Sequence, residues 1–322
     1  MTSYLDTVPH PWSHADIQSA IFKSFTDAKA AIENTEGGRL WRSLLELDDS
    51  VYVLESNISD LLDEISLFAD RTKNPAFWHQ ADGSEAKRNT REVKRKLSNC
   101  TAALMALVDH ARNFAHASPV PNYSDELRKH FLLPGLHDFL QCLRNYNTHW
   151  RIAQANWIIS QGREANSRQV RFIVEKAELL AWSGWNAAAK DYIKGVTEFV
   201  DLYEVFFNYR EHAQKFYAWH RGAVLSQYNV MLRPYMEYKR IYEGISKKYH
   251  WNMIISHVPK SLNPLQYLSQ YLPSHAVDRV LALPHQSKKQ ADEVIRLLDL
   301  DEFCDEALRD KVYALSGAKN EA

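Results

Sequence analysis

Glycine and proline are scarce in this chain, which has 10 and 11 of them among 322 residues. A strand-rich fold needs many tight turns, and these two residue types are prominent in turns. Their scarcity therefore favours long helices joined by few loops. We expect an all-α fold.

Cysteine is scarcer still, with Cys100, Cys142 and Cys304 far apart in the sequence. An odd number of distant cysteines argues against a disulfide framework and against a zinc knuckle. This usage fits a reducing compartment.

Neither a charge excess nor a long apolar run is present. The chain carries 39 basic and 40 acidic residues, a formal net charge of −1. This balance excludes a uniformly basic nucleic-acid wrapper but leaves room for a local basic patch. No run approaches the roughly 18 apolar residues of a membrane span, and residues 1–22 do not resemble a signal peptide. We expect a cytoplasmic protein without a membrane segment.

Several motifs of cofactor and metal enzymes are also missing. The sequence has no phosphate-binding Walker loop, no dinucleotide-binding glycine fingerprint and no His-Glu-x-x-His zinc motif. It also lacks the Glu-x-x-His pairs that di-iron helical bundles use. We therefore expect no cofactor and no metal site.

Two stripes of apolar residues dominate the first third of the chain. Both advance by steps of three and four, which is the heptad pattern of packed helices. A short loop between them predicts an antiparallel helical hairpin, and an intermolecular coiled coil is the alternative. The stripes are Leu40, Leu44, Leu47, Val51, Leu54, Ile58, Leu61, Ile65 and Phe68, and then Val93, Leu97, Cys100, Leu104, Leu107, Ala111 and Phe114.

The remaining pattern predicts shorter elements. A helix capped by Ser13 is expected over 14–33, with further helices over 125–131 and 136–151. Residues 152–160 and 169–174 indicate one small β-hairpin. One or two long helices over 186–249 are expected to kink or divide at Pro234. Two amphipathic helices are expected over 286–299 and 301–315.

The helix over 136–151 separates apolar from polar residues. At 100° per residue its core face is expected to carry Leu136, Phe139, Leu140, Leu143, Tyr146 and Trp150. Asn145 and His149 lie one turn apart on the other side, and Arg144 lies about 140° from His149. A histidine exchanges protons near neutral pH, and an arginine grips phosphate. Together they suffice for metal-free attack of a ribose 2′-hydroxyl on the adjacent phosphorus.

This segment resembles a known family. Arg144-Asn145-Tyr-Asn-Thr-His149 is similar to the signature of HEPN domains, an Arg with a polar residue after it and a His a few residues on. The block 136–149 resembles the core helix of bacterial HEPN-like proteins. The resemblance is firm over 130–150 and loose over 150–220.

The resemblance implies a homodimeric helical bundle and a metal-independent endoribonuclease, such as a toxin or an antiphage defence effector. It implies catalytic roles for Arg144, Asn145 and His149 in a site shared by two copies, and a protein antitoxin or regulator as a further partner. The corresponding division is a helical hairpin region over 1–120, a HEPN-like core over 121–250 packed with it as one domain, and a C-terminal helical extension over 251–322.

A basic run beside the second apolar stripe could hold the RNA. Lys87, Arg91, Lys94 and Arg95 recur at helical spacing and form one positive strip. The competing interpretation is an ordinary solvated helix face. Arg112 and His116 repeat the Arg–His pairing at a closer spacing, and we interpret them as a helix C-terminus.

Two other functions remain open from the sequence. The first is a non-catalytic dimerisation or partner-binding protein, in which the hairpin 36–116 recruits a partner helix. The second is the binding of a nucleotide or small ligand in a helical cleft.

Overall fold

The computed structural model describes residues 3–74, 77, 84–150, 152–153, 156–161, 168–258 and 264–318. These residues are mostly helical, with one small antiparallel sheet, so the helical fold expected from the scarcity of glycine and proline is confirmed. Contacts group the chain into two compact units, Leu40–Asn229 and Met1–Arg39 with Val230–Ala322. We call them the central unit and the terminal unit. The division at residues 120 and 250 stays a prediction.

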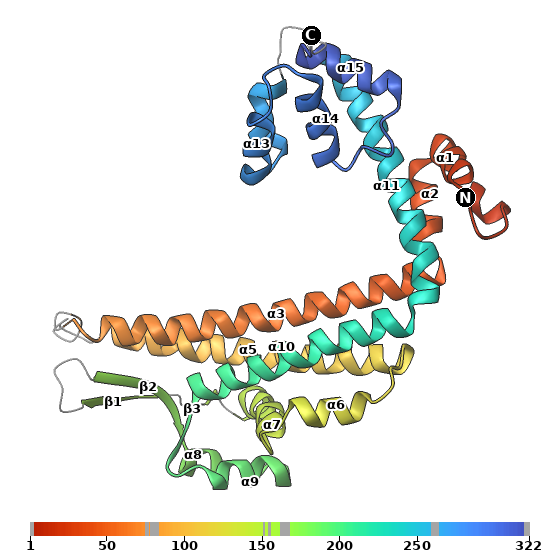
Figure 1. Ribbon diagram of the computed structural model, residues 1–322. Coiled ribbons are helices and arrows are strands. Elements are labelled where there is room, and N and C mark those ends of the chain that lie inside the picture. Colours follow the sequence, from red (N-terminus) through yellow and green to blue (C-terminus); the bar gives the residue numbers. More distant parts are fainter. Residues whose placement is uncertain are drawn as a thin grey trace. The chain divides into compact units, whose positions relative to one another are not determined.

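The predicted helical hairpin is confirmed. It consists of α3 (Glu36–Arg71) and α5 (Ser84–Ala117), which lie side by side in Figure 1. Leucines 44, 54 and 61 of the first stripe are at most 1% exposed. The stripe is thus buried within this chain, and the hairpin does not leave it open for a partner helix.

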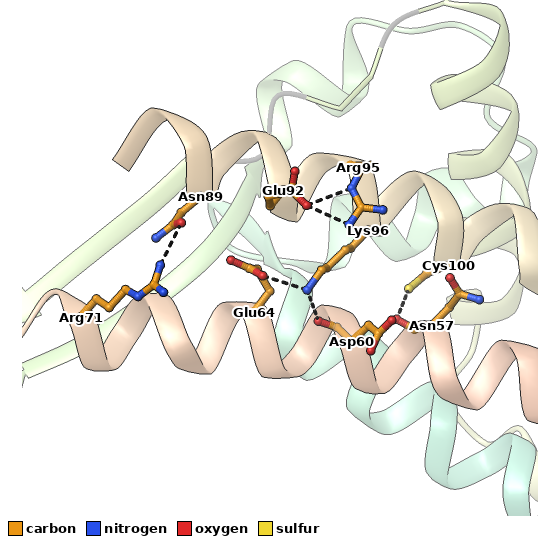
Figure 2. A network of polar contacts seen from close by, with 9 residues as sticks. All are labelled: Asn57, Asp60, Glu64, Arg71, Asn89, Glu92, Arg95, Lys96 and Cys100. Carbon is orange, nitrogen blue, oxygen red and sulfur yellow. Dashed lines mark hydrogen bonds and ion pairs between the residues drawn. The ribbon is translucent and has the colours of Figure 1, made fainter. Parts of the chain in front are cut away.

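Polar contacts across the hairpin fix its antiparallel direction. As the residue number rises along α3, the number of its partner on α5 falls. Asn57 O accepts from Cys100 Sγ (3.0 Å), Glu64 Oε2 accepts from Lys96 Nζ (2.8 Å), and Arg71 Nη1 donates to Asn89 Oδ1 (3.4 Å). Figure 2 shows these contacts linking the two helices.

The rest of the central unit packs beside this hairpin. It contains α6 (Tyr123–His130), α7 (Leu136–His149), α8 (Lys176–Leu180), α9 (Ala187–Gly195) and α10 (Leu202–Gln227). The C-terminal half of α10 meets both hairpin helices, because Arg221 forms an ion pair with Asp48 and the His220 ring lies 5.5 Å from Phe114. Helix α7 packs against α5 and α9.

A three-stranded sheet adjoins the hairpin near the end of α3 (Figure 1). Strand β1 (Asn156–Gln161) pairs with β2 (Arg168–Glu175), which pairs with β3 (Phe199–Asp201), both antiparallel. Phe172 of β2 is buried and its ring lies 5.0 Å from Phe68 of α3. The predicted β-hairpin is confirmed, but the third strand was not expected.

Strand β3 also corrects the long helix expected over 186–249. Backbone pairing of Glu175 with Phe199 holds residues 199–201 extended, and Asp201 then caps α10 by accepting from Tyr203 N (2.9 Å). The next division falls at Tyr228, between α10 and α11 (Asn229–His257), while Pro234 lies inside α11.

The terminal unit is built from short helices around α11. They are η1 (Tyr4–Thr7), α1 (His14–Lys23), α2 (Phe25–Glu33), η2 (Pro264–Tyr267), α12 (Leu268–Tyr271), α13 (Ser274–Leu281), α14 (Lys288–Leu297) and α15 (Glu306–Ser316). The predicted Ser13 cap is confirmed, since its hydroxyl accepts from Asp16 N (3.2 Å). The single helix over 14–33 is wrong, because extended Ser24 ends α1 and caps α2.

Among the residues described, no helix is both long enough and apolar enough to cross a membrane.

Candidate functional site

Helix α7 carries the Arg144–His149 segment, and its entry is fixed by a glycine. Gly135 precedes the helix with a φ of +76°, and a Cβ there would lie 2.5 Å from Ala188 O of α9. The left-handed backbone and the close approach both require glycine. Asn186 Nδ2, at the start of α9, donates to Asp138 Oδ1 (2.8 Å). The first turn of α7 is therefore clamped to α9.

Aromatic packing anchors the core face of α7. Phe139 stacks between Trp185 and Tyr192, with ring centroids 5.6 and 5.1 Å away. Tyr146 is fully buried and its hydroxyl donates to Glu178 Oε1 (2.9 Å). These contacts determine the rotation of the helix about its own axis, and hence which residues face outward.

The three candidate catalytic residues lie on the outward side. Asn145 and His149 are exposed and Arg144 is half-buried. Arg144 Nη1 donates to Asn145 Oδ1 (3.1 Å), while His149 is the last residue of α7. Five residues of helix separate Arg144 from His149 by about 7.5 Å along the axis. The helix thus brings Arg144 and Asn145 into contact, and it places His149 one turn beyond Asn145 and about 140° around the axis from Arg144.

The residues between them have structural partners. Asn147 Oδ1 accepts from Ala153 N (2.9 Å), and its Nδ2 donates to Thr101 Oγ1 of α5 (3.5 Å). The Thr148 hydroxyl donates to Arg144 O (2.9 Å). Asn147 therefore fixes the chain that leaves α7 and holds the end of this helix against α5.

Trp150 departs from the sequence-based prediction. It was expected on the core face, but it is 43% exposed. It lies just beyond the helix end, with φ −119° and ψ −70°, so the helical period no longer sets its direction. Its ring contacts Tyr146 edge-on (4.9 Å), and the exposed part adjoins His149 in the sequence. The helical pattern of the sequence continues past Trp150, so no sequence signal reveals this exposure.

Comparison with protein-family models, curated proteins and solved structures gives no match to this chain.

The basic strip occupies the first turns of α5. Lys87, Arg91 and Arg95 are exposed and Lys94 is half-buried. Arg95 Nε donates to Glu92 Oε2 (2.9 Å), as Figure 2 shows, and this hydrogen bond raises the pKa of Arg95. An exposed ion pair of this kind is weak, so a phosphate can compete for the guanidinium.

The strip begins near the end of α7. Asn147 meets Thr101, and Arg95 lies six residues from Thr101, about 9 Å along the axis of α5. Lys87 lies about 21 Å from the same point. The basic side chains thus extend along α5 away from the level of the candidate site.

A second histidine of α7, the half-buried His137, was not singled out by the sequence. Gln141 Nε2 donates to His137 Nε2 (2.9 Å), and His137 Nδ1 lies 3.0 Å from the Tyr209 hydroxyl. Burial lowers the pKa of His137 and raises that of Tyr209. Both groups are neutral near pH 7, so this chain of hydrogen bonds joins α7 to α10 rather than offering an accessible acid or base.

The second Arg–His pair serves as a natural comparison. Arg112 contacts Asp109 (3.8 Å), and exposed His116 lies in the last turn of α5, as the sequence indicated.

Among the described residues, no group of three or more His, Cys, Asp or Glu side chains is arranged to hold a metal ion.

Proposed function

We propose that this protein is a cytoplasmic, homodimeric endoribonuclease of HEPN type, acting as a toxin or antiphage defence effector. One observation carries the proposal. Arg144, Asn145 and His149 lie on the outward side of a helix whose other residues are clamped to α5 and α9. A phosphate-binding group and a proton-exchanging group are thus held on one rigid element, which favours a catalytic role.

The proposed reaction uses these side chains from two copies of the chain. His149 removes the proton from a ribose 2′-hydroxyl, and the 2′-oxygen attacks the adjacent phosphorus. The bond from phosphorus to the 5′-oxygen breaks, and that oxygen takes a proton from a second imidazole. The products are a 2′,3′-cyclic phosphate and a 5′-hydroxyl. Arg144 neutralises charge that develops on the phosphoryl oxygens, and Asn145 orients its guanidinium through their hydrogen bond.

A homodimer supplies the second imidazole. Within one chain the outward side of α7 offers one histidine, His149, since His137 is half-buried and both of its ring nitrogens contact other side chains. Two copies facing each other would provide one base and one acid, together with two arginines. Light scattering on the purified protein tests this, and a strict monomer under cleavage conditions would refute the shared site.

Two neighbouring features suit single-stranded RNA. The exposed ring of Trp150 offers a stacking surface for a nucleobase. The strip Lys87, Arg91, Lys94 and Arg95 offers positive charge for the phosphates that follow. We propose that RNA passes Trp150 at the cleavage site and continues along α5.

The deciding experiment is incubation with end-labelled RNA in EDTA. We expect wild-type protein to leave 2′,3′-cyclic phosphate ends, and Arg144→Ala and His149→Ala to reduce the rate by about 100-fold or more. His116→Ala is the matched control, because His116 is also exposed in the last turn of a helix. Equal cleavage by wild type and His149→Ala would remove the mechanism, and so would absence of cleavage by the wild type.

Partner binding without catalysis is the second candidate. The buried stripe of α3 cannot serve it, but the outer side of α3 exposes Leu45, Tyr52 and Val53, with Tyr52 70% exposed. Leu45 and Tyr52 are seven residues apart and share a face. This candidate predicts that Tyr52→Ser shifts the assembly state in light scattering while RNA is never cleaved. An unchanged assembly state would argue against it.

A further inference from the structure

The terminal unit contains an apolar cavity that is partly open to solvent. Its volume is about 600 Å³, and its wall comes from α11, η2, α12, α14 and α15. This volume falls within the usual range for small-ligand sites.

The cavity adjoins two hydrophobic clusters, and Leu298, which lines it, packs against both of them. Leu265 and Val294 of the first cluster and Ile295 and Leu308 of the second all line it. The members of the first are Leu265, Leu268, Leu272, Ala276, Val280 and Val294, and those of the second are Ile295, Leu300, Cys304 and Leu308. An apolar occupant would bury further surface of both clusters.

The lining has little to offer a polar occupant. Among its described residues none is charged. The Tyr271 hydroxyl donates to Pro264 O (2.8 Å) and the Ser316 hydroxyl to Tyr313 O (3.1 Å). Burial raises the pKa of Cys304, so its thiol is uncharged at neutral pH. Tyr267 and Gln270 also belong to the described lining, which is otherwise mostly apolar.

A lysine side chain links two of the lining helices, α15 and α11. Lys311 Nζ of α15 donates to Asn252 Oδ1 (2.7 Å) and contacts Ser256 Oγ (3.5 Å), both on α11. The neighbouring residues Ile255 and Val312 line the cavity. The ammonium group of Lys311 thus contacts neutral acceptors, next to residues that line the cavity.

Two other basic residues of the terminal unit, Lys248 and Arg309, contact carboxylates rather than neutral acceptors. Lys248 is paired with Asp305 at 2.6 Å, and Arg309 with Asp292 at 2.5 Å. Each of these charges is offset by a carboxylate in direct contact, whereas Asp305 acts on the charge of Lys311 only at longer range. The ammonium of Lys311 can exchange its neutral acceptors for the carboxylate of a ligand and gain a charge-assisted hydrogen bond.

We propose that this cavity binds a single-chain fatty acid, with the acyl chain inside and the carboxylate at Lys311. A flexible chain can follow an irregular space between helices, and its charged end has to remain at the edge, because burial of an unpaired charge is costly. The site extends the small-ligand function left open by the sequence and is independent of RNA cleavage.

Calorimetric titration of the full chain with dodecanoate, below its micellar concentration, tests the proposal. We expect saturable binding by wild-type protein. Ala291→Leu places extra atoms in the cavity, since Ala291 lines it and is buried, and should weaken binding about tenfold or more. Ala314→Leu, on an exposed position of α15, is the matched control and should bind like wild type. Cys304→Leu fills the cavity from the second cluster and replaces Ala291→Leu should that variant fail to fold.

A second arm separates the free acid from a neutral acyl compound. Lys311→Met should weaken dodecanoate binding roughly five- to twentyfold and leave dodecanol binding unchanged. No heat with wild-type protein, or equal binding by wild type and both filled variants, would overturn the proposal. Equal loss of dodecanoate and dodecanol in Lys311→Met would overturn the placement of the carboxylate.

Discussion

We predict that replacing glycine by alanine destabilises the protein at Gly135, where α7 begins, and stabilises it at Gly222, within α10. Gly135→Ala introduces a Cβ at φ +76°, 2.5 Å from Ala188 O and 3.0 Å from Tyr192 Cβ. The left-handed backbone costs an alanine about 1 kcal/mol, and relief of the overlap costs about 1–3 kcal/mol. The expected loss of stability is therefore about 2–4 kcal/mol.

The control is Gly222→Ala, within α10. No atom lies within 4 Å of a Cβ placed there, so alanine should stabilise the helix by about 0.5–1 kcal/mol. In a unit of this size 1 kcal/mol corresponds to about 2–4 °C in Tm. Gly135→Ala should lower the Tm of the central unit by roughly 4–16 °C, and Gly222→Ala should raise it by roughly 1–4 °C.

Thermal unfolding followed by circular dichroism, with calorimetry to resolve separate transitions, measures both changes. Gly135→Ala should also reduce RNA cleavage at temperatures where the protein stays folded, because α7 must move away from Ala188. A Tm within about 1 °C of wild type for Gly135→Ala would refute the reasoning. It would mean that α9 yields to the added methyl group at no cost.

Three further predictions concern single side chains. Burial lowers the pKa of His220 to about 4. As pH falls below about 6.5, this imidazole takes up a proton in the unfolded chain but not in the folded one, so the free energy of unfolding decreases. His220→Phe should therefore stabilise the protein by about 2 kcal/mol more at pH 5 than at pH 8, and urea titrations that give equal shifts at both pH values would contradict this. Lys96→Met should cost about 1.5–3 kcal/mol, because the side chain of Glu64, its partner at 2.8 Å, is 13% exposed and loses a charged hydrogen bond. Arg95→Met, at an exposed pair, should cost less than about 1 kcal/mol, and similar costs for the two would speak against the role of burial. Trp150→Ala should weaken binding of a 2′-deoxy-substituted RNA by roughly 5- to 100-fold in fluorescence anisotropy, and unchanged affinity would exclude the stacking role.

The hairpin was predictable because its signal is local and redundant. Each stripe repeats the same apolar spacing over many turns, so a single irregular position does not obscure it. Ser13 was predictable for a similar reason, since a cap and its partner Asp16 lie within one turn.

Two interruptions of the predicted helices could not be predicted from the local sequence pattern. Phe199 fits a helical pattern with Tyr203 and Phe206, yet it lies in a strand because Glu175 offers an open backbone edge. Trp150 fits the apolar side of α7, yet the helix ends one residue earlier. In both cases the local pattern is compatible with helix, and tertiary pairing or the end of the element decides otherwise.

The candidate site divides in the same way. The sequence by itself determined that Arg144, Asn145 and His149 avoid the apolar side of one helix, because that follows from the helical period alone. Their role in RNA cleavage stays a prediction from the motif. The tertiary structure decided that this side faces outward, since the clamps at Gly135, Phe139, Tyr146 and Asn147 set the rotation of α7.

The cavity of the terminal unit belongs wholly to the tertiary structure. Its lining residues are spread from Trp251 to Ser316 and read as ordinary core positions in the sequence. Apolar periodicity specifies that a side chain turns inward, but not whether neighbouring helices approach closely enough to fill the space between them. That depends on crossing angles and side-chain volumes, which exist only once the helices have packed.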